Sequence, residues 1–473
     1  MKKIVIISVL SLMMAAVAMP TVSNVKLASD DGREFTVTYN LADGPAVITL
    51  SVETNSGSAW VTMDDKVVSR ALGDVNRKIT GTSGTITFVP DIELPADTST
   101  VRAKVTAWPM DDTPDYMVYS LAQMEANLTA DDRVRYYAST NALPGGLLDN
   151  IDYRLGLMVF RKIKAAGVTF TMGTDFKLET SATGYEPREA AHNAKLHRNY
   201  YLAVFPLTQG QYRILKGADQ SDEEFVIERY LRLKARLSYT AIRGTSLYPN
   251  APSDSSILGI MRKTSGKTID FDLPSEAEWE YACRAGYGHN YYGTGVEMTM
   301  TYAGGRNSDP EMDRIGRYRW NQASEWYVNS DGNVALNQAN IIANAKSQGV
   351  TNGVPIAGSY APNAWGLYDM LGGVMELCLD YYQDDITKYN GAVNVNADGT
   401  RRFDGSMSTK INKDGVEVED PKRVRKGGSW AENAFVCRPA YRDGVTPGYV
   451  ADKLDNGLRV KCYMGLRKID PEQ

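Results

Sequence analysis

The sequence predicts an α+β protein in which a small all-β domain precedes a larger domain with few helices. Short runs of alternating apolar and polar residues fill the chain from about residue 20 to 125, as in strands with one buried face. The 473 residues include 41 Gly, 28 Tyr and 7 Trp, a composition that indicates turn-rich, aromatic-rich β structure. One segment beyond the middle of the chain carries a full helix-start signature, so helices are expected to be present but sparse.

The first residues have the pattern of a secretory signal. Lys2 and Lys3 precede an apolar stretch, and Ala16-Val17-Ala18 is a small-residue cleavage site. We therefore expect residues 1–18 to be removed near Ala18 and the protein to be exported to the periplasm, the cell surface or the medium. The alternative for this stretch is a buried N-terminal strand. The apolar run is too short to span a bilayer and no later run reaches 18 apolar residues, so no transmembrane segment is expected.

The charge of the chain argues against nucleic-acid binding. Lys and Arg number 52 and Asp and Glu 57, a net charge of −5, and loss of Lys2 and Lys3 with the signal gives −5 − 2 = −7. A nucleic-acid binder needs a basic surface to neutralise phosphates. The expected partner is instead a protein, a peptide or a glycan, and with 3 His in the chain a poly-histidine metal centre is nearly excluded.

Residues 19–125 are expected to form a β-sandwich of fibronectin or immunoglobulin type. Apolar and polar residues alternate in four segments: Phe35–Tyr39, Ile48–Val52, Thr85–Phe88 and Val101–Ala107. Turn residues separate these segments, and none of the cysteines lies among them. A spacer or docking role is expected for this domain because it carries no chemical motif.

The remainder of the chain is expected to be a connector, residues 126–166, followed by the second domain, residues 167–466. Within the connector, Arg133–Tyr137 can add a strand. In the second domain Ser275 and Glu278 form a capping box, which predicts a helix start. A further helix is expected over Glu223–Leu237, and residues 384–421 have the polar composition of an exposed insertion.

Three glutamates of the helix that begins at Ser275 have the pattern of a run of catalytic carboxylates. Glu276, Glu278 and Glu280 are expected to spread over different faces of the helix, which favours capping and ion pairing over catalysis.

Five blocks of the second domain resemble, in order, the formylglycine-generating enzyme (sulfatase-modifying factor) family. The blocks are Gly167–Gly173, Phe205–Tyr212, Leu273–Gly286 (LPSEAEWEYACRAG), Pro362–Glu376 (PNAWGLYDMLGGVME) and Arg423–Trp430 (RVRKGGSW), the last followed by Arg438–Arg442 and Gly457–Val460. The resemblance implies a C-type-lectin-like fold of small twisted sheets with much irregular structure. It does not cover the N-terminal sandwich, and it leaves function open because function depends on the site.

The copper enzymes of that family bind Cu(I) with two cysteines, which follow the aromatic residue of the G-G-S motif at two and seven positions. Here the aromatic residue is Trp430, Glu432 stands at the first position and Cys437 at the second. Counting back from Arg442 instead removes Cys437 from the second position as well. A carboxylate cannot replace a soft thiolate for Cu(I), so copper is not expected. Cys437 and Ser429 remain the candidate catalytic residues.

All four cysteines of the chain, Cys283, Cys378, Cys437 and Cys462, lie in its second half. They can form disulfides or remain as packed thiols. In the family's enzymes the cysteine of the W-E-Y-x-C block pairs with one near the R-x-A-x-R block. The resemblance therefore implies a possible Cys283–Cys437 bridge.

The resemblance also implies calcium, which family members bind largely through main-chain carbonyls. The matching positions are Leu371, Gly372, Val374 and Glu376. Carbonyl oxygens and a carboxylate suit a hard cation. A second, weaker set is Asn340, Ile341, Gln348 and Val350, where Gln348 replaces an acidic ligand. Ordinary turns without metal are the alternative for both sets.

Two functional hypotheses follow from these observations. The first is an exported member of the family that lacks the copper cysteine pair and binds a ligand or partner. The second is an enzyme, either a formylglycine-generating oxidase acting on a sulfatase cysteine or another oxidase of the family. The missing cysteine favours the first hypothesis, whereas the intact blocks around Gly427, Arg438 and Arg459 keep the second open. Tryptophans such as Trp365 can stack on sugars or peptides, but the alternative is that they belong to the core.

Overall fold

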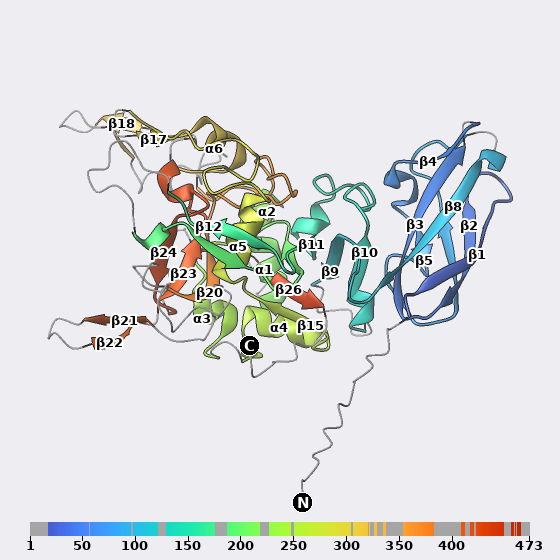
Figure 1. Ribbon diagram of the computed structural model, residues 1–473, viewed down its shortest axis with the longest axis horizontal. Helices are drawn as coiled ribbons and strands as arrows, with labels where there is room; N and C mark the ends of the chain where they lie inside the picture. The colour runs from blue at the N-terminus through green and yellow to red at the C-terminus, as the bar shows by residue number, and fades with distance from the viewer. Residues whose placement is uncertain are drawn as a thin grey trace, which may run out of the picture. The chain divides into compact units, whose positions relative to one another are not determined.

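The computed structural model divides the chain into two compact units, residues 1–113 and 114–473 (Figure 1). It describes residues 18–55, 57–95, 98–121, 129–175, 187–217, 227–246, 250–303, 306–319, 321, 326–328, 334–336, 353–382, 408–411, 417–420, 422–448, 456–457, 459 and 461–464. The expected signal segment lies almost entirely outside these residues. No helix among them is long and apolar enough to cross a membrane.

The first unit consists of two antiparallel sheets. One sheet has the order β1-β2-β7-β5, and in the other β3 pairs with β4, β6 and β8. The strands are β1 (Thr21–Ala28), β2 (Phe35–Ala42), β3 (Ala46–Asn55), β4 (Trp60–Thr62), β5 (Leu72–Gly73), β6 (Lys78–Ile79), β7 (Ser83–Phe88) and β8 (Val101–Pro109). The all-β N-terminal region is confirmed, whereas its fibronectin or immunoglobulin type stays a prediction.

The core of the first unit lies between its two sheets and follows the alternation of the sequence. On β2, Phe35, Val37 and Tyr39 are buried and Thr38 is exposed. Tyr39 extends across the core and donates a hydrogen bond to the carbonyl of Asp74 at 2.8 Å. Its ring lies against Gly84, where a Cβ atom would come within 2.3 Å of the Tyr39 hydroxyl. This approach explains why a glycine occupies the second position of β7.

The boundary between the units lies earlier than the sequence indicates, after Thr113 rather than after residue 125. β9 (Tyr116–Ser120) pairs with β10 (Val134–Tyr137) and with β11 (Leu157–Ile163) in a sheet of the second unit. The expected connector, residues 126–166, therefore supplies strands to the second unit. The expected strand at Arg133–Tyr137 is confirmed. Pairing between strands far apart in sequence fixes this boundary, and such pairing leaves no local signal.

The second unit has two larger sheets that share no strand. The first has six strands in the order β10-β9-β11-β14-β26-β15, and the second has four in the order β24-β23-β20-β25. Their remaining strands are β14 (Tyr200–Ala203), β15 (Ile269–Asp272), β20 (Met375–Tyr381), β23 (Arg423–Lys426), β24 (Arg442–Val445), β25 (Asn456–Gly457) and β26 (Lys461–Met464). The first sheet thus joins segments from both ends of the unit, whereas the strands of the second all lie between residues 375 and 457.

Hairpins and short helices complete the second unit. The hairpins are β12 (Thr169–Met172) with β13 (His192–Lys195), β16 (Thr301–Ala303) with β17 (Arg306–Ser308), β18 (Trp326–Val328) with β19 (Val334–Leu336), and β21 (Ser408–Ile411) with β22 (Glu417–Asp420). The helices are α1 (Gln209–Lys216), α2 (Ile227–Leu231), α3 (Tyr239–Arg243), α4 (Ile257–Thr264), α5 (Glu276–Arg284) and α6 (Pro310–Ile315). Small sheets and short helices confirm the α+β class.

Two helix predictions have different outcomes. α5 begins at the expected place: the Ser275 side chain accepts from the Glu278 backbone N–H, and the Glu278 side chain accepts from the Ser275 N–H. The helix expected over Glu223–Leu237 is much shorter, since α2 ends at Leu231 and Leu233 forms a β-bridge with Thr208. The start of that prediction lies outside the described residues.

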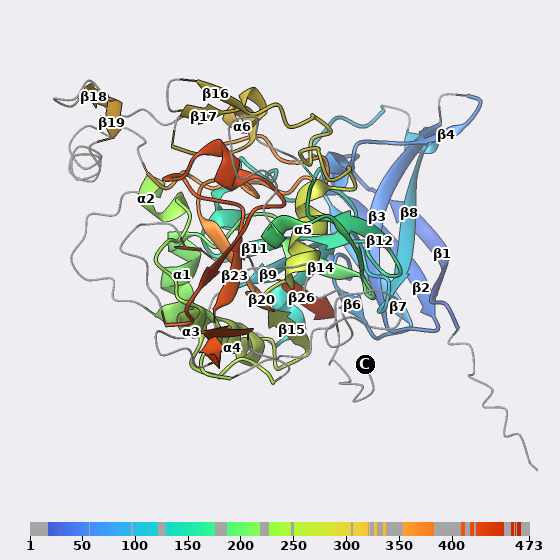
Figure 2. The ribbon, with the colours of Figure 1, turned by 60° about the vertical axis from the view of Figure 1, so that its left-hand side comes forward.

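Helix α5 is the central element of the second unit. It contacts β12, β20 and β23, and Figure 2 shows it beside β12. Its residues Trp279, Ala282 and Cys283 are buried in the main apolar cluster of the unit. The side chains that surround α5 therefore decide whether the family blocks form a catalytic or metal site.

Candidate functional site

The G-G-S-W segment follows β23 as a tight turn. Gly427 and Gly428 have φ values of +86° and +69°, a region that favours glycine. A Cβ atom at Gly428 would lie 2.5 Å from the sulfur of Cys437, and one at Gly427 would lie 2.7 Å from the carbonyl oxygen of Met370. The two glycines thus allow the backbone to pack directly on Cys437 and on the segment before Leu371.

Cys437 ends a short 3₁₀ turn, Ala434–Cys437, and is fully buried. Its Sγ lies 3.8 Å from the carbonyl oxygen of Ser429, to which the thiol donates. Burial raises the pKa of this thiol, and the charge of Glu432 raises it further. A thiol held protonated in this way is a poor metal ligand and a poor nucleophile.

Ser429, the other candidate catalytic residue, is also fully buried. Its Oγ accepts a hydrogen bond from the Ala431 N–H at 3.3 Å, and its carbonyl accepts one from the Glu432 N–H at 3.0 Å. These contacts stabilise the turn. The structure thus brings Ser429 and Cys437 together as neighbours in the core, with the Cys437 thiol hydrogen-bonded to the Ser429 carbonyl.

The Cys283–Cys437 bridge implied by the resemblance is not formed. Cys283, Cys378 and Cys437 are buried free thiols. Cys283 lies in the last turn of α5 and lines a small cavity with Asp369, whereas the Cys437 thiol donates to Ser429. Burial raises the pKa of the Cys283 and Cys378 thiols as well. The resemblance implied this pairing, but the sequence does not determine where each thiol points.

The calcium set does not fit a hard cation as expected, because its only charged member has other partners. Glu376 is buried, and Nε of Arg459 lies 3.1 and 2.9 Å from its two carboxylate oxygens. Nε1 of Trp279 donates to the same carboxylate at 2.6 Å. A guanidinium thus already contacts both oxygens of this carboxylate and neutralises the charge that would attract a cation.

The other expected calcium positions are packed tightly. The Gly372 N–H donates to the carbonyl of Gly427 at 2.7 Å, and the Gly373 carbonyl accepts from the Trp430 N–H at 3.0 Å. A Cβ atom at Gly372 would lie 2.2 Å from the carbonyl oxygen of Arg317. Leu371 and Val374 are buried in apolar clusters.

Two further findings concern metals. Among the described residues, no group of three or more His, Cys, Asp or Glu side chains is placed to hold a metal ion. The second calcium set, Asn340, Ile341, Gln348 and Val350, lies outside the residues that the structure describes.

The glutamates of α5 lie at the centre of a buried ionic network. Arg442 binds Glu276 through two hydrogen bonds of 2.8 Å. Nζ of Lys426 lies 2.9 Å from Glu280 and 3.6 Å from Glu276, so these two carboxylates share one face of the helix. This corrects the expectation that the three glutamates point to different faces, since residues four apart in a helix are neighbours. The expected ion pairing and the capping by Glu278 are present.

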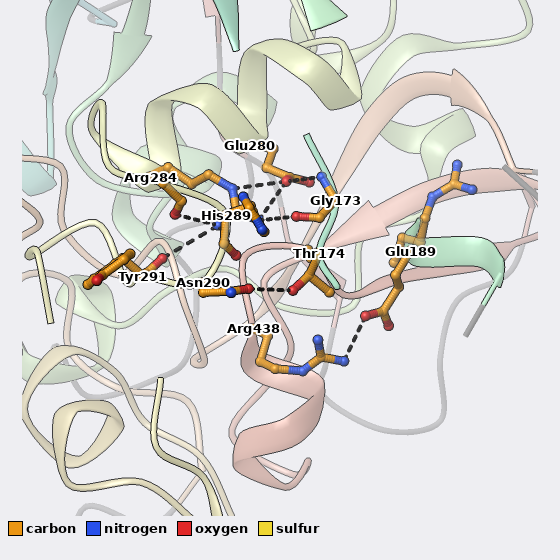
Figure 3. A network of polar contacts seen from close by, with 12 residues as sticks. Gly173, Thr174, Glu189, Glu280, Arg284, His289, Asn290, Tyr291 and Arg438 are labelled. Atoms are coloured by element: carbon orange, nitrogen blue, oxygen red, sulfur yellow. Dashed lines mark hydrogen bonds and ion pairs between the residues drawn. The ribbon is translucent and has the colours of Figure 1, made fainter. Parts of the chain in front are cut away.

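Arg284 and Glu280 connect this network to neighbouring loops (Figure 3). Glu280 accepts from the Gly173 N–H at 2.7 Å and from Nη2 of Arg284 at 2.8 Å. Arg284 also donates to the carbonyls of Gly173 and His289, both at 2.8 Å. Burial acts to raise the pKa of Glu280, but the Lys426 and Arg284 cations together lower it below its ordinary value. The network therefore consists of matched charges with a structural role.

Sequence reasoning missed three members of this region. Lys426 and Arg459 lie within family blocks, but nothing in the sequence pairs them with Glu280 and Glu376. Asp369 was also overlooked: it is buried, and its Oδ2 accepts from the Gly358 N–H at 2.7 Å. A useful signal was available in the charged residues inside otherwise apolar blocks, because buried charges are nearly always paired.

The chain belongs to the family of the sulfatase-modifying factor enzyme 1-like domain, whose model matches residues 159–461. It is 29% identical over 170 residues to a formylglycine-generating enzyme of Thermomonospora curvata, covering 36% of this chain and 40% of that protein. It is 26% identical over 192 residues to one of Streptomyces coelicolor, covering 40% and 45%. The chain thus spans less than half the length of these relatives.

Solved structures give weaker likenesses. PvdO from Pseudomonas aeruginosa is 20% identical with a TM-score of 0.39, covering 65% of this chain and 94% of PvdO. Variable protein 1 of Treponema denticola is 16% identical with a TM-score of 0.40, covering 65% and 95%. These scores are too low to support an argument, so family membership rests on the family model.

Proposed function

We propose that this chain is an exported member of the sulfatase-modifying factor family that binds a ligand or protein partner and does not oxidise cysteine. The surroundings of Cys437 carry this proposal. Its thiol is buried, is held protonated and is hydrogen-bonded to the Ser429 carbonyl. Glu432 stands where the family's copper enzymes have their first cysteine. Copper-dependent oxidation needs two soft ligands, and a single protonated thiol supplies none.

The buried ionic network supports a scaffold role for the remaining family blocks. Glu276, Glu280 and Glu376 are each paired with an arginine or lysine inside the second unit. No acid or base among these three is left to move a proton. The blocks that resemble the enzymes thus account for the architecture, and a binding role uses surface loops that this architecture holds in place.

A copper titration tests the proposal. Cu(I) is offered to the reduced full-length protein in competition with a chromophoric chelator of nanomolar affinity. We expect the chelator to retain the metal, with identical curves for wild type, Cys437→Ser and the matched control Cys378→Ser. One equivalent of Cu(I) taken from the chelator by wild type and by Cys378→Ser, but not by Cys437→Ser, would overturn the proposal in favour of an oxidase.

A further inference from the structure

The loop between α5 and β16 exposes an unusual set of apolar side chains. Tyr287, Tyr291 and Val296 are 42%, 39% and 42% exposed. Residues 286–297, called the aromatic loop below, therefore present two phenol rings and an aliphatic side chain to solvent within one short segment. Clustered exposed aromatic residues are typical of binding surfaces.

Glycines support the rings of this surface. A Cβ atom at Gly295 would lie 2.8 Å from the ring of Tyr287, and one at Gly288 would lie 3.6 Å from the ring of Tyr291. The half-buried Trp365 lies in the same relation to Gly286, at 3.5 Å. The Tyr287 and Tyr291 rings thus lie close to backbone and remain 42% and 39% exposed, so part of each is available to a partner.

The aromatic loop is held in one conformation from beneath. Nη1 of the buried Arg284 donates to the carbonyl of His289 at 2.8 Å, with longer contacts of 3.3 Å to the carbonyl of Gly288 and 3.5 Å to that of Tyr291. Across the loop, the Tyr292 N–H donates to the Val296 carbonyl at 2.8 Å. Figure 3 shows Arg284 directed at the backbone of His289 and Tyr291. A preorganised loop loses little conformational entropy on binding.

The surroundings of the aromatic loop are acidic. The Asp175 side chain is 65% exposed, and its Oδ1 lies 3.0 Å from Nε2 of His289 on the loop. Glu297 ends the loop and is exposed. Residues 168–175, 285–298 and 361–367 contain no lysine or arginine, and the nearby Arg314, whose side chain is 51% exposed, is paired with Glu311 at 2.6 Å. The surface therefore combines aromatic faces with negative charge.

We infer that the aromatic loop, with Asp175 and Glu297, is a docking surface for a protein partner that presents arginine or lysine side chains. A cation over the face of an aromatic ring is attracted by the ring quadrupole, and a neighbouring carboxylate adds a charged partner. Phosphate-bearing and other anionic ligands are disfavoured by the same charges. The inference rests on the proposed binding function and specifies where a partner binds and which chemistry it carries.

A peptide panel tests the inference on the full-length protein. The probes are a Gly-Ser peptide with three arginines, the same peptide with citrulline in place of arginine, and a neutral chitin hexasaccharide. Citrulline keeps the shape of arginine and removes its charge. We expect the arginine peptide to bind at least tenfold more tightly than the citrulline peptide, and we expect this preference to weaken as salt rises. Binding is read by calorimetry.

Variants assign the binding to the loop. Tyr291→Ala and the double variant Asp175→Asn, Glu297→Gln should each weaken arginine-peptide binding at least fivefold. The matched controls Val61→Ala and Asp254→Asn change exposed residues elsewhere and should leave it unchanged. Circular dichroism confirms that each variant is folded. Absence of arginine-peptide binding, equal binding of the citrulline peptide, preferential binding of the glycan, or full binding by the loop variants would each overturn the inference. None of these outcomes bears on the copper titration, so the two proposals fail separately.

Discussion

A carboxylate that faces a metal and one that faces an arginine look alike in a sequence. Glu376 illustrates this, because the family block that contains it suggests a calcium ligand, whereas its oxygens contact Arg459 and Trp279. The sequence identified the residue as important and could not identify its partner, since Arg459 lies 83 positions further along the chain.

The pairing of Glu376 with Arg459 predicts how the protein responds to calcium. Glu376→Gln leaves the guanidinium buried without a counter-charge, which should cost about 3–5 kcal/mol of unfolding free energy. Chelator or added Ca²⁺ should leave the Tm of wild type unchanged. Thermal melts with EDTA or with Ca²⁺ measure both effects. A Tm that rises with Ca²⁺ in wild type and not in Glu376→Gln would restore the calcium site.

Asp369 makes the stability of the second unit dependent on pH. Burial raises its pKa to about 6, and the Glu376 charge adds to this, while the Gly358 N–H, Arg459 and Arg317 oppose it. The folded state thus favours the protonated acid, so this stabilisation is complete below pH 4 and is lost as the pH rises through 6. A difference of about two pKa units corresponds to roughly 3 kcal/mol.

Replacement of Asp369 by asparagine tests this dependence. Asn retains an oxygen for the Gly358 N–H, is uncharged at every pH and tolerates the φ of +54° at this position. Urea unfolding should show wild type losing stability between pH 4 and 7, and Asp369→Asn should lose about 3 kcal/mol less over that range. Parallel pH profiles for the two proteins would contradict the assignment.

At the scale of elements, the sequence predicts correctly those features that depend on interactions between residues close together in the chain. The capping box of α5 and the alternation of β2 were both readable, because each depends on residues a few positions apart. Longer-range features were not. α2 stops where Leu233 pairs with Thr208, and β9 joins a sheet whose other strands follow it in the chain. Strand pairing of this kind has no local signature. The predicted domain boundary and the predicted length of the helix at α2 therefore differ from the structure.

The buried face of α5 gives a prediction at this scale. Lys426 is the shared cation between Glu276 and Glu280, and each glutamate has one further arginine partner. Lys426→Met should therefore destabilise the second unit by about 3 kcal/mol, the lower end of the cost of breaking a buried pair. The exposed Lys263 on α4 is a matched control, and Lys263→Met should change stability by less than about 0.5 kcal/mol. Denaturant unfolding measures both, and similar values for the two variants would refute the network's role.

At the scale of the whole molecule, each unit encloses a core of its own. We therefore expect two unfolding transitions that respond to mutations separately. Gly84→Ala places a methyl group against the Tyr39 ring and should cost the first unit about 1–3 kcal/mol. Calorimetry should show one transition lowered by at least about 4 °C and the other unchanged. A single transition that shifts as a whole would contradict independent units.

We propose that the chain keeps the scaffold of its family without the oxidation of cysteine that the copper enzymes carry out. The most direct measurement offers the reduced full-length protein a Cys-x-Pro-x-Arg peptide with copper and O₂, and follows the peptide by mass spectrometry. We predict that the peptide cysteine stays unconverted at a level indistinguishable from a reaction without protein. Formylglycine that appears with wild type and disappears with Cys437→Ser would contradict the claim and identify the chain as an oxidase.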